Sequence, residues 1–213
     1  MMTVKWAPIT ETETIPPLGT VLSAHLSGLH GIVKYASCSA WNLLYQTMQE
    51  NGLPIGDVTF TDTGKPYLLD SSIYFSLSHS HDICAVAISD HLVGVDVEII
   101  KTSYPPHLIE RSLTDAEKAV YDGDFTLIWC RKEAVAKMTG EGISGYPVNI
   151  DTTNYTFDEK QIEWNGQKYW LVAIEQEHLS ENNMVCVPLW TDSKGEHSGN
   201  TVSTIRPRAF KNI

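Results

Sequence analysis

The seven residues Val93–Ile99 alternate between two kinds of side chain, and this alternation restricts the folds open to the chain. The odd positions are apolar, whereas the even positions hold Gly94, Asp96 and Glu98. Because successive side chains of a β-strand point to opposite faces, the pattern predicts a strand with its hydrophobic residues on one face and both carboxylates on the other. A fold that contains this strand must bury the apolar face against another layer.

The residues before this strand predict one helix followed by antiparallel strands. Ser37–Glu50 has helical apolar spacing and stops before Asn51-Gly52, which suits a left-handed helix cap. The turn Asp62-Thr63-Gly64 predicts a hairpin, and the polar turn Ser89-Asp90-His91 separates two later strands. Strands are expected at Val58–Thr61, Pro66–Leu69, Ile73–Leu77 and Ile83–Ile88, and with Val93–Ile99 they are expected to form an antiparallel sheet.

Tyr104-Pro105-Pro106 interrupts the chain near its midpoint, and the residues that follow predict helices and then strands again. Thr114 and Glu117 have the spacing of a capping box, so a helix is expected to begin there. A second helix is expected at Thr126–Met138, and strands are expected at Ile162–Trp164, Lys168–Ile174 and Met184–Leu189. The polar segment from Thr191 is expected to be loosely held. The predicted fold class is α+β, in two halves of similar make-up, residues 1–103 and 104–213.

Asp96 and Glu98 are the first candidate site residues. Two carboxylates on one strand face repel each other and stay ionised only beside water or a cation. Mg²⁺ is a natural occupant because it prefers carboxylate and phosphate oxygens. The ordinary alternative is a solvated face of an edge strand, since the spacing D-x-E is common.

Glu133 and Lys137 lie four residues apart on the predicted helix Thr126–Met138, opposite its apolar stripe. The simplest interpretation is a surface ion pair that stabilises the helix by a few tenths of a kcal/mol. If the stripe packs on the sheet, however, Glu133 can complete a three-carboxylate metal site with Asp96 and Glu98. Lys137 would then lie one turn away, where it can neutralise a phosphate.

Ser78-His79-Ser80-His81-Asp82 is a third polar cluster. His79 and His81 alternate on an extended segment and could bind zinc, but a third strong ligand at standard spacing is missing. A histidine flanked by hydroxyls is a reasonable anion contact. The alternative is that His79 ends a strand with its ring partly packed.

Composition excludes several classes of partner. The formal net charge of -11, from 15 Lys+Arg against 26 Asp+Glu, argues against a surface that recruits nucleic acid or anionic membrane. An anionic ligand must therefore meet local cations. No stretch approaches the roughly 20 apolar residues of a membrane helix, and Met1 to Pro17 lacks an apolar signal core, so a cytoplasmic location is expected. The four scattered cysteines, Cys38, Cys84, Cys130 and Cys186, indicate reduced thiols.

Four blocks occur in order along the chain: Gly64-Lys65-Pro66, Phe75-Ser76-Leu77-Ser78-His79-Ser80, Gly94-Val95-Asp96-Val97-Glu98 and Trp129-Cys130-Arg131-Lys132-Glu133-Ala134-Val135-Ala136-Lys137. Together they resemble the phosphopantetheinyl transferase superfamily, whose members move the phosphopantetheine arm of coenzyme A onto a serine of a carrier protein. The resemblance covers about Gly64 to Gly142, and its blocks are specific only in combination. The length resembles the larger class, that of the surfactin-synthetase-activating enzyme, in which two similar halves form a monomeric pseudo-dimer.

The resemblance implies a Mg²⁺-dependent enzyme of the holo-[acyl-carrier-protein] synthase type, with an acyl or peptidyl carrier protein and coenzyme A as partners. Asp96, Glu98 and Glu133 would be the Mg²⁺ ligands. Glu133 would act as base and Lys137 would neutralise the departing 3′,5′-ADP. The residues implied to hold coenzyme A are Lys65, Pro66, Ser78, His79 and Lys137, with His79 near the 3′-phosphate.

The chain departs from this pattern at its first predicted helix. Larger-class relatives usually bring basic residues from that helix to the coenzyme's phosphates, whereas Tyr35 to Gln49 contains none and Lys34 is the nearest substitute. Carrier proteins are usually acidic, so docking on this acidic protein needs a local apolar or basic patch. Two other functions stay open, a metal-dependent phosphohydrolase and a non-catalytic module that binds carrier proteins or coenzyme A.

Overall fold

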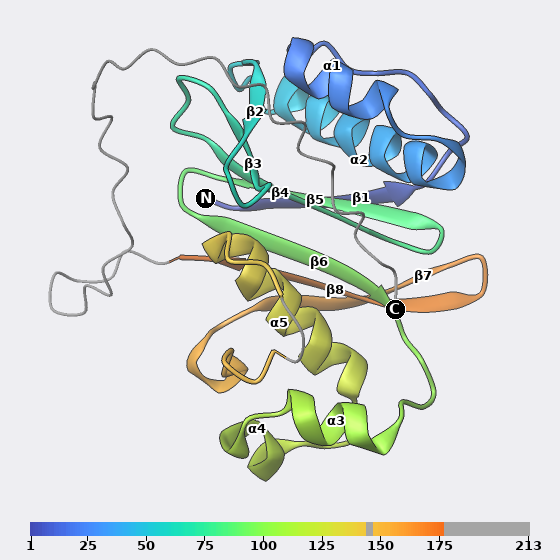
Figure 1. Cartoon of the computed structure of the whole chain (residues 1–213), viewed down its shortest axis with the longest axis vertical. Helices are drawn as coiled ribbons and strands as arrows, with labels where there is room; N and C mark the ends of the chain where they lie inside the picture. Colours follow the sequence, from blue (N-terminus) through green and yellow to red (C-terminus); the bar gives the residue numbers. More distant parts are fainter. Residues whose placement is uncertain (144–146, 177–213) are drawn as a thin grey trace, which may run out of the picture. The chain divides into compact units, whose positions relative to one another are not determined.

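The computed structural model of this chain describes residues 1–143 and 147–176 (Figure 1). It has mixed helices and antiparallel sheets, so the expected α+β class is confirmed. The helical elements are α1 (Thr20–Ser27), α2 (Gly31–Glu50), α3 (Pro106–Ser112), α4 (Asp115–Val120), α5 (Phe125–Thr139) and the 3₁₀ turn η1 (Thr152–Asn154). The strands are β1 (Thr3–Pro8), β2 (Val58–Phe60), β3 (Pro66–Leu68), β4 (Tyr74–Ser80), β5 (Ile83–Ser89), β6 (Val93–Ile99), β7 (Asp158–Trp164) and β8 (Gln167–Glu175).

Two three-stranded antiparallel sheets have the orders β1-β5-β4 and β6-β8-β7. The predicted hairpin forms a separate two-stranded sheet, β2-β3. The expectation of one sheet running through Val93–Ile99 is wrong. The turn Ser89-Asp90-His91 carries the chain from the first sheet into the second, because β6 pairs with β8 and not with β5.

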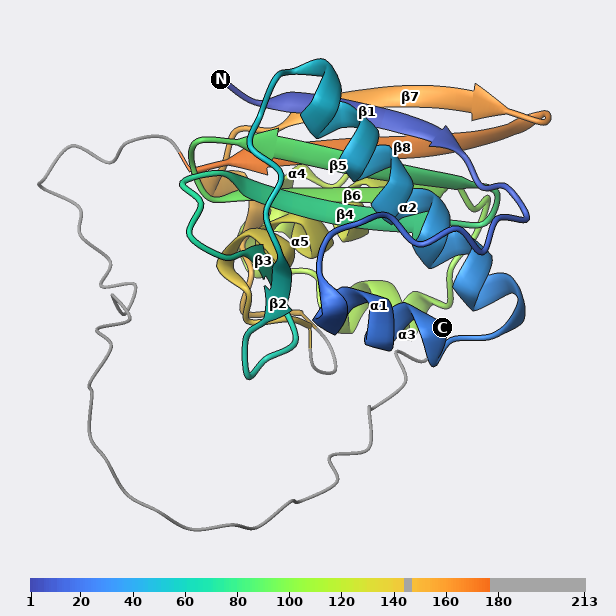
Figure 2. The same ribbon diagram turned by 90° about the horizontal axis from the view of Figure 1, so that it is seen from above.

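The elements of Met1–His178 that are described form layers, with a hydrophobic cluster between each pair of layers (Figure 1). Leu44 and Trp41 of α2 pack with Val86 and Ile88 of β5, and the turned view shows α2 lying over the first sheet (Figure 2). A second cluster joins the facing sides of the two sheets. A third cluster joins α5 to the far face of β8. The second sheet is therefore covered on both faces.

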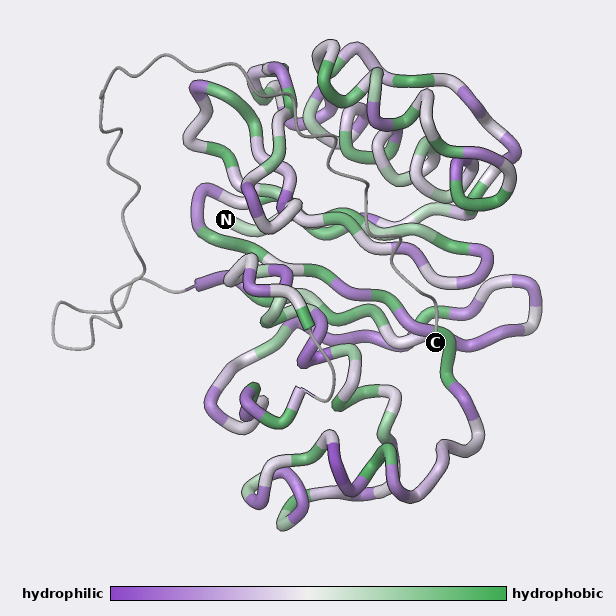
Figure 3. Tube along the Cα trace, in the orientation of Figure 1, coloured by the Kyte–Doolittle hydropathy of each residue, from purple (hydrophilic) through white to green (hydrophobic). Residues whose placement is uncertain are grey.

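β6 has the predicted two-sided pattern. Its odd residues Val93, Val95 and Val97 are buried in the cluster between the sheets, and hydropathy alternates along the strand (Figure 3). The even residues therefore face α5. A Cβ added at Gly94 would lie 1.9 Å from the carbonyl oxygen of Ala134 in α5. Only glycine allows the helix to approach the strand this closely.

Helix α4 begins at the predicted capping box, in which Thr114 and Glu117 exchange hydrogen bonds with each other's backbone N–H groups. Glu117 is also paired with Lys132 of α5 at 2.7 Å, and both side chains are buried. Arg131, which interrupts the predicted apolar stripe of α5, extends to Glu159 of β7 at 2.9 Å. These ion pairs join α5 to its neighbours on both sides.

Most predicted elements are found within one to three residues of their expected ends, with the longest extension in α2, which begins at Gly31. Sequence reasoning missed β1, α1 and α3. The expected strand Met184–Leu189 and the segment from Thr191 lie outside the described residues. Cys38, Cys84 and Cys130 are buried free thiols, as expected, whereas Cys186 also lies outside that part of the chain.

Candidate active site

Strand β4 lies beside β6, and three of its serines bridge the two strands. The hydroxyls of Ser76, Ser78 and Ser80, here called the serine ladder, accept hydrogen bonds from the backbone N–H groups of Val95, Val97 and Ile99, at 3.0, 3.3 and 3.2 Å. The ladder thereby satisfies the free N–H groups of an edge strand. It also brings β4 to the face where Asp96 and Glu98 lie.

Asp96 is the most buried of the candidate ligands, with 2% of its surface exposed. Its Oδ1 atom accepts a hydrogen bond from Ser78 at 2.7 Å and from the Lys137 ammonium at 2.6 Å. Its Oδ2 atom is buried and has no hydrogen-bond partner among the described residues. A buried carboxylate oxygen without a partner is rare, and it is the kind of group that a bound cation or water satisfies.

Lys137 is not the surface partner of Glu133 that the simplest interpretation predicted. Its ammonium contacts Asp96 and the Ser78 hydroxyl, at 2.6 and 2.8 Å. Although burial works against the charged form, the carboxylates of Asp96 and Glu133 raise the pKa of Lys137. The tight packing of α5 on Gly94 brings this lysine to the strand.

Glu98 and Glu133 complete the acidic group. Burial, followed by repulsion from Asp96, raises the pKa of Glu98 to about 7, and the same two causes raise the pKa of Glu133 to about 7. Ser80 donates a hydrogen bond to Glu98 at 3.0 Å and opposes this shift. Three carboxylates therefore lie near one ammonium, that of Lys137, so a cation would be favoured here.

The structure therefore brings Asp96, Glu98, Glu133 and Lys137 into one site between β6 and α5, although the three carboxylates do not form a tight cage. Across residues 1–143 and 147–176, the group whose donor atoms all lie within 4.8 Å of one another is instead Asp90, His91 and Glu175. That cluster already holds the Met1 ammonium at Asp90 and the Ser89 hydroxyl at Glu175.

Ser78 and Lys65, both expected to hold coenzyme A, are engaged within the protein. The Ser78 hydroxyl donates to Asp96 and accepts from Val97 and Lys137, which uses its proton and both lone pairs. Lys65 donates to the carbonyl oxygen of Met138 at the end of α5, at 2.6 Å, and burial lowers its pKa to about 8. Pro66 follows Lys65 and begins β3.

His79 lies on β4 next to the ladder and is exposed, with partial desolvation and the nearby Lys137 charge both lowering its pKa. His81 lies in the following turn beside Asp82, at 3.1 Å. Neither histidine joins a three-ligand metal group within the described ranges.

The serine ladder itself was missed by sequence reasoning. Its signal was present in Phe75-Ser76-Leu77-Ser78-His79-Ser80, where serine occupies every second position. A strand's period of two puts these hydroxyls on one face.

Comparison with known proteins bears on what this site does. Residues 92–186 match the family model of the 4′-phosphopantetheinyl transferase superfamily. The matched segment includes Asp96, Glu98, Glu133 and Lys137, whereas Lys65, Ser78 and His79 precede it.

Individual relatives of this transferase superfamily agree with the match. The chain is 33% identical over 115 residues to the 4′-phosphopantetheinyl transferase AcpT of Salmonella typhi, covering 47% of this chain and 57% of the relative. It is 32% identical over 118 residues to AcpT of Escherichia coli K12, covering 48% and 58%. The transferase psf-1 of Bacillus pumilus is 34% identical over 103 residues, covering 43% and 44%. The chain thus spans about half the length of the curated relatives it matches.

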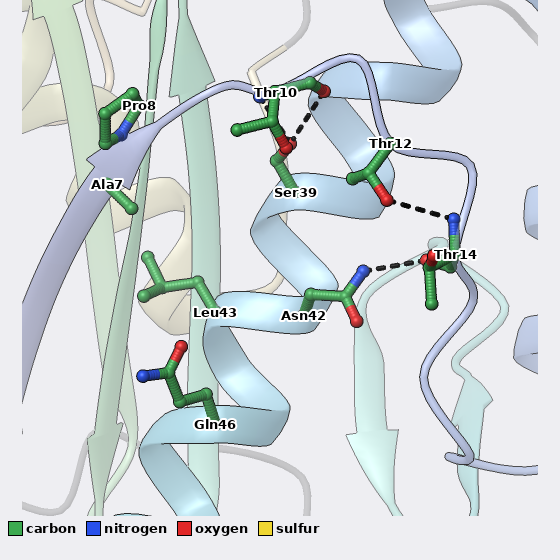
Figure 4. A pocket seen from close by; sticks show the side chains of 9 residues that line it. All are labelled: Ala7, Pro8, Thr10, Thr12, Thr14, Ser39, Asn42, Leu43 and Gln46. Atoms are coloured by element: carbon green, nitrogen blue, oxygen red, sulfur yellow. Dashed lines mark hydrogen bonds between the residues drawn. The ribbon is translucent and has the colours of Figure 1, made fainter.

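Away from these carboxylates, a pocket of about 300 Å³ lies between α2 and the end of β1 with the residues that follow it (Figure 4). Ser39 and Asn42 of α2 pin the backbone at Thr10 and Thr14 across it. Its lining contains no charged side chain, so it does not suit a metal ion or a pyrophosphate.

No helix in the described ranges is long and apolar enough to cross a membrane.

Proposed function

We propose that this protein transfers the 4′-phosphopantetheine arm of coenzyme A to a serine hydroxyl of an apo carrier protein and releases 3′,5′-ADP. The observation that carries the proposal is the convergence of Asp96, Glu98, Glu133 and Lys137 between β6 and α5. The names of the relatives, all 4′-phosphopantetheinyl transferases, support the same reaction.

We propose that Asp96, Glu98 and Glu133 hold Mg²⁺. Carboxylate oxygens are the ligands this ion prefers, and the unpartnered buried Oδ2 atom of Asp96 offers one of them. The pKa values of Glu98 and Glu133, raised first by burial and then by repulsion from Asp96, are a further reason, because a cation would stabilise the charged forms of these buried carboxylates. When bound, the metal supplies charge neutralisation at the pyrophosphate of coenzyme A.

Glu133 and Lys137 have different roles in the proposed reaction. The oxygen of the carrier serine forms a bond to the β-phosphorus, while its proton passes to Glu133. A carboxylate beside the serine hydroxyl can take up this proton as a general base. The bond from phosphorus to the bridging oxygen breaks, and 3′,5′-ADP leaves with its new negative charge facing the Lys137 ammonium.

The nucleotide end of coenzyme A is assigned to Lys65, Pro66, Ser78 and His79. His79 is exposed beside the site and can contact the 3′-phosphate. Lys65 and Ser78 would have to exchange a hydrogen bond within the protein for one to the coenzyme. Lys34, the nearest substitute for the basic residues that are missing from Tyr35 to Gln49, pairs with Glu13 at 2.7 Å.

We propose that the two sheets belong to two similar halves of one pseudo-dimeric monomer. In each sheet the strand that comes last in the chain lies between the other two, because β5 lies between β1 and β4, and β8 lies between β6 and β7. Each sheet is also covered by a long helix, α2 or α5. In such a pseudo-dimer β4 corresponds to β7, and β6 corresponds to β1. The counterpart of the contact between β4 and β6 would therefore be a contact between β7 and β1. There the aromatic rings of Trp6 and Trp164 lie 6.3 Å apart. Only the first junction would therefore carry a polar site.

Two finer assignments complete the proposal. The enzyme would be of the holo-[acyl-carrier-protein] synthase type, acting on acyl or peptidyl carrier proteins and without affinity for nucleic acid or membrane, given the net charge of -11. It would work in the cytoplasm, where the buried free thiols of Cys38, Cys84 and Cys130 stay reduced.

The direct test incubates the protein with Mg²⁺, coenzyme A and a panel of apo carrier proteins and weighs the products by mass spectrometry. A carrier that gains one phosphopantetheine, with loss of the gain in Asp96→Asn, supports the proposal. Release of phosphate or nucleotide without a modified carrier would favour a phosphohydrolase. Absence of any product from carriers that a known transferase modifies would reject catalysis of this reaction.

A further inference from the structure

The hydroxyls of the serine ladder accept hydrogen bonds from the backbone of β6, and two of them also donate hydrogen bonds to carboxylates. Each hydroxyl accepts a hydrogen bond from a backbone N–H group of β6. Ser78 and Ser80 also donate, to Asp96 Oδ1 at 2.7 Å and to Glu98 Oε2 at 3.0 Å. Ser76 accepts from the N–H group of Val95, and the residue before Val95 is Gly94, which has no side chain to receive a bond. Among the described residues, the Ser76 hydroxyl therefore bonds to the backbone of β6 and to no carboxylate.

This bonding fixes one oxygen of each carboxylate. An accepted backbone N–H bond restricts where a serine hydroxyl can direct its proton, and here the proton points at the carboxylate of the preceding residue in β6. Asp96 Oδ1 is held by Ser78 and Lys137, which leaves the buried Oδ2 atom without a partner. Glu98 is held through Oε2, which leaves Oε1 as its other oxygen.

We propose that Ser78 and Ser80 are positioning residues that aim the free oxygens of Asp96 and Glu98 at the cation. This inference rests on the proposed metal site. Hydrogen-bond partners of metal ligands typically change metal affinity by about tenfold to a hundredfold when they are removed. Ser78 also contacts Lys137, so its substitution disturbs more than one group. Ser80 has Glu98 as its side-chain partner and is the residue to test.

Ser76 provides a matched control. Ser76→Ala and Ser80→Ala each remove one serine bond to a β6 N–H group, but only Ser80→Ala also removes a bond to a carboxylate. Ser80→Thr keeps the hydroxyl and is the conservative rescue. A purely structural role predicts that the two alanine variants behave alike.

The experiment titrates the full chain with MnCl₂ and with MgCl₂, following Mn²⁺ by electron paramagnetic resonance and Mg²⁺ by calorimetry, and records each variant's melting temperature without metal. Ser80→Ala is expected to weaken binding of both ions by about tenfold or more. Ser76→Ala is expected to stay within about twofold of the wild type, whatever its melting temperature, and Ser80→Thr to recover most of the affinity.

The variant Asp96→Asn distinguishes a failure of the positioning role of Ser80 from a failure of the proposed metal site. If the wild type binds the ions and Asp96→Asn does not, but Ser80→Ala binds normally, the positioning role is wrong while the proposed metal site stands. Equal losses in Ser76→Ala and Ser80→Ala would also overturn it, as would a failure of Ser80→Thr to recover affinity. If the wild type binds neither ion, the metal site and this inference both fall. Should Ser76→Ala not fold, the comparison of Ser80→Ala with Ser80→Thr decides.

Discussion

At the scale of single residues, the site is a group of carboxylates with too few positive charges. Asp96 is neutralised by Lys137, whereas Glu98 and Glu133 have raised pKa values because burial and the neighbouring charge favour their protonated forms. Such paired shifts are typical of catalytic or metal-binding groups.

Glu133→Gln should lower kcat by about a hundredfold or more while leaving the Kd for coenzyme A within about tenfold, because the amide cannot accept the serine proton. Single-turnover assays and calorimetry measure the two quantities separately. Glu163→Gln on β7, where the side chain is exposed, serves as the control and should retain wild-type turnover. Unchanged turnover in Glu133→Gln would remove this residue from the reaction.

Lys137→Met should lower the free energy of unfolding by about 1 to 3 kcal/mol without metal, because the buried Asp96 carboxylate would lose its charged partner. This differs from the small effect expected of an exposed helix pair. Saturating Mg²⁺ should reduce the difference, since the proposed cation would neutralise the same carboxylate. Urea unfolding with and without Mg²⁺ measures both effects, and equal stability of variant and wild type without metal would argue against the ion pair.

Stability without divalent cations should fall as the pH rises from about 5.5 to 7.5. The pKa values of Glu98 and Glu133 are about 7 in the folded protein, against 4.5 as the ordinary value. The folded state therefore binds more protons than the unfolded state in this window, so raising the pH favours unfolding until both groups are ionised. The double variant Glu98→Gln/Glu133→Gln should show a flatter dependence in urea titrations, and identical pH slopes would contradict the assignment.

At the scale of elements, the site depends on how closely α5 approaches β6. Gly94 permits the contact with Ala134, and the buried Lys132–Glu117 pair holds the other side of the helix to α4. Lys132 also donates to the backbone oxygens of Pro147 and Ile150. The helix therefore has little freedom to shift along the strand, and Glu133 and Lys137 take their positions from it.

Gly94→Ala should force the helix away from the strand and lower the free energy of unfolding by about 1 to 3 kcal/mol, since the added methyl group would overlap the Ala134 carbonyl. Activity should fall further than stability, because Lys137 moves with the helix. Gly28→Ala is the control: a Cβ there would meet its nearest atom at an ordinary 3.5 Å, so thermal melts should match the wild type. A melting temperature for Gly94→Ala equal to that of Gly28→Ala would show that α5 can adjust freely.

At the scale of the whole described unit, the two sheets share one core. Ile83 and Ala85 of the first sheet pack with Val95, Tyr169 and others of the second, and the serine ladder adds hydrogen bonds between β4 and β6. Each sheet by itself would expose an apolar face to water. The site at the junction therefore needs both segments.

Fragments 1–91 and 92–213, expressed separately, should each lack a cooperative thermal transition, because the cluster between the sheets is divided between them. Mixing the two should restore a transition, together with binding of Mn²⁺ if the metal site is as proposed. Circular dichroism melts of each fragment and of the mixture measure this outcome. A fragment that melts cooperatively alone would show that its sheet is an independent domain.

Period-two and period-3.6 patterns were sufficient to predict β6, its two-sided character and most of α5, because these are local properties of the backbone. The Asp-x-Glu pair and the Glu133/Lys137 spacing were likewise visible in the sequence. Which residues meet was decided by tertiary structure. The pairing of Lys137 with Asp96, the crossing at Ser89–His91 into a second sheet and the serine ladder all join segments distant along the chain. Local periodicity assigns a residue to a face, but packing and the burial of charge determine what lies opposite that face.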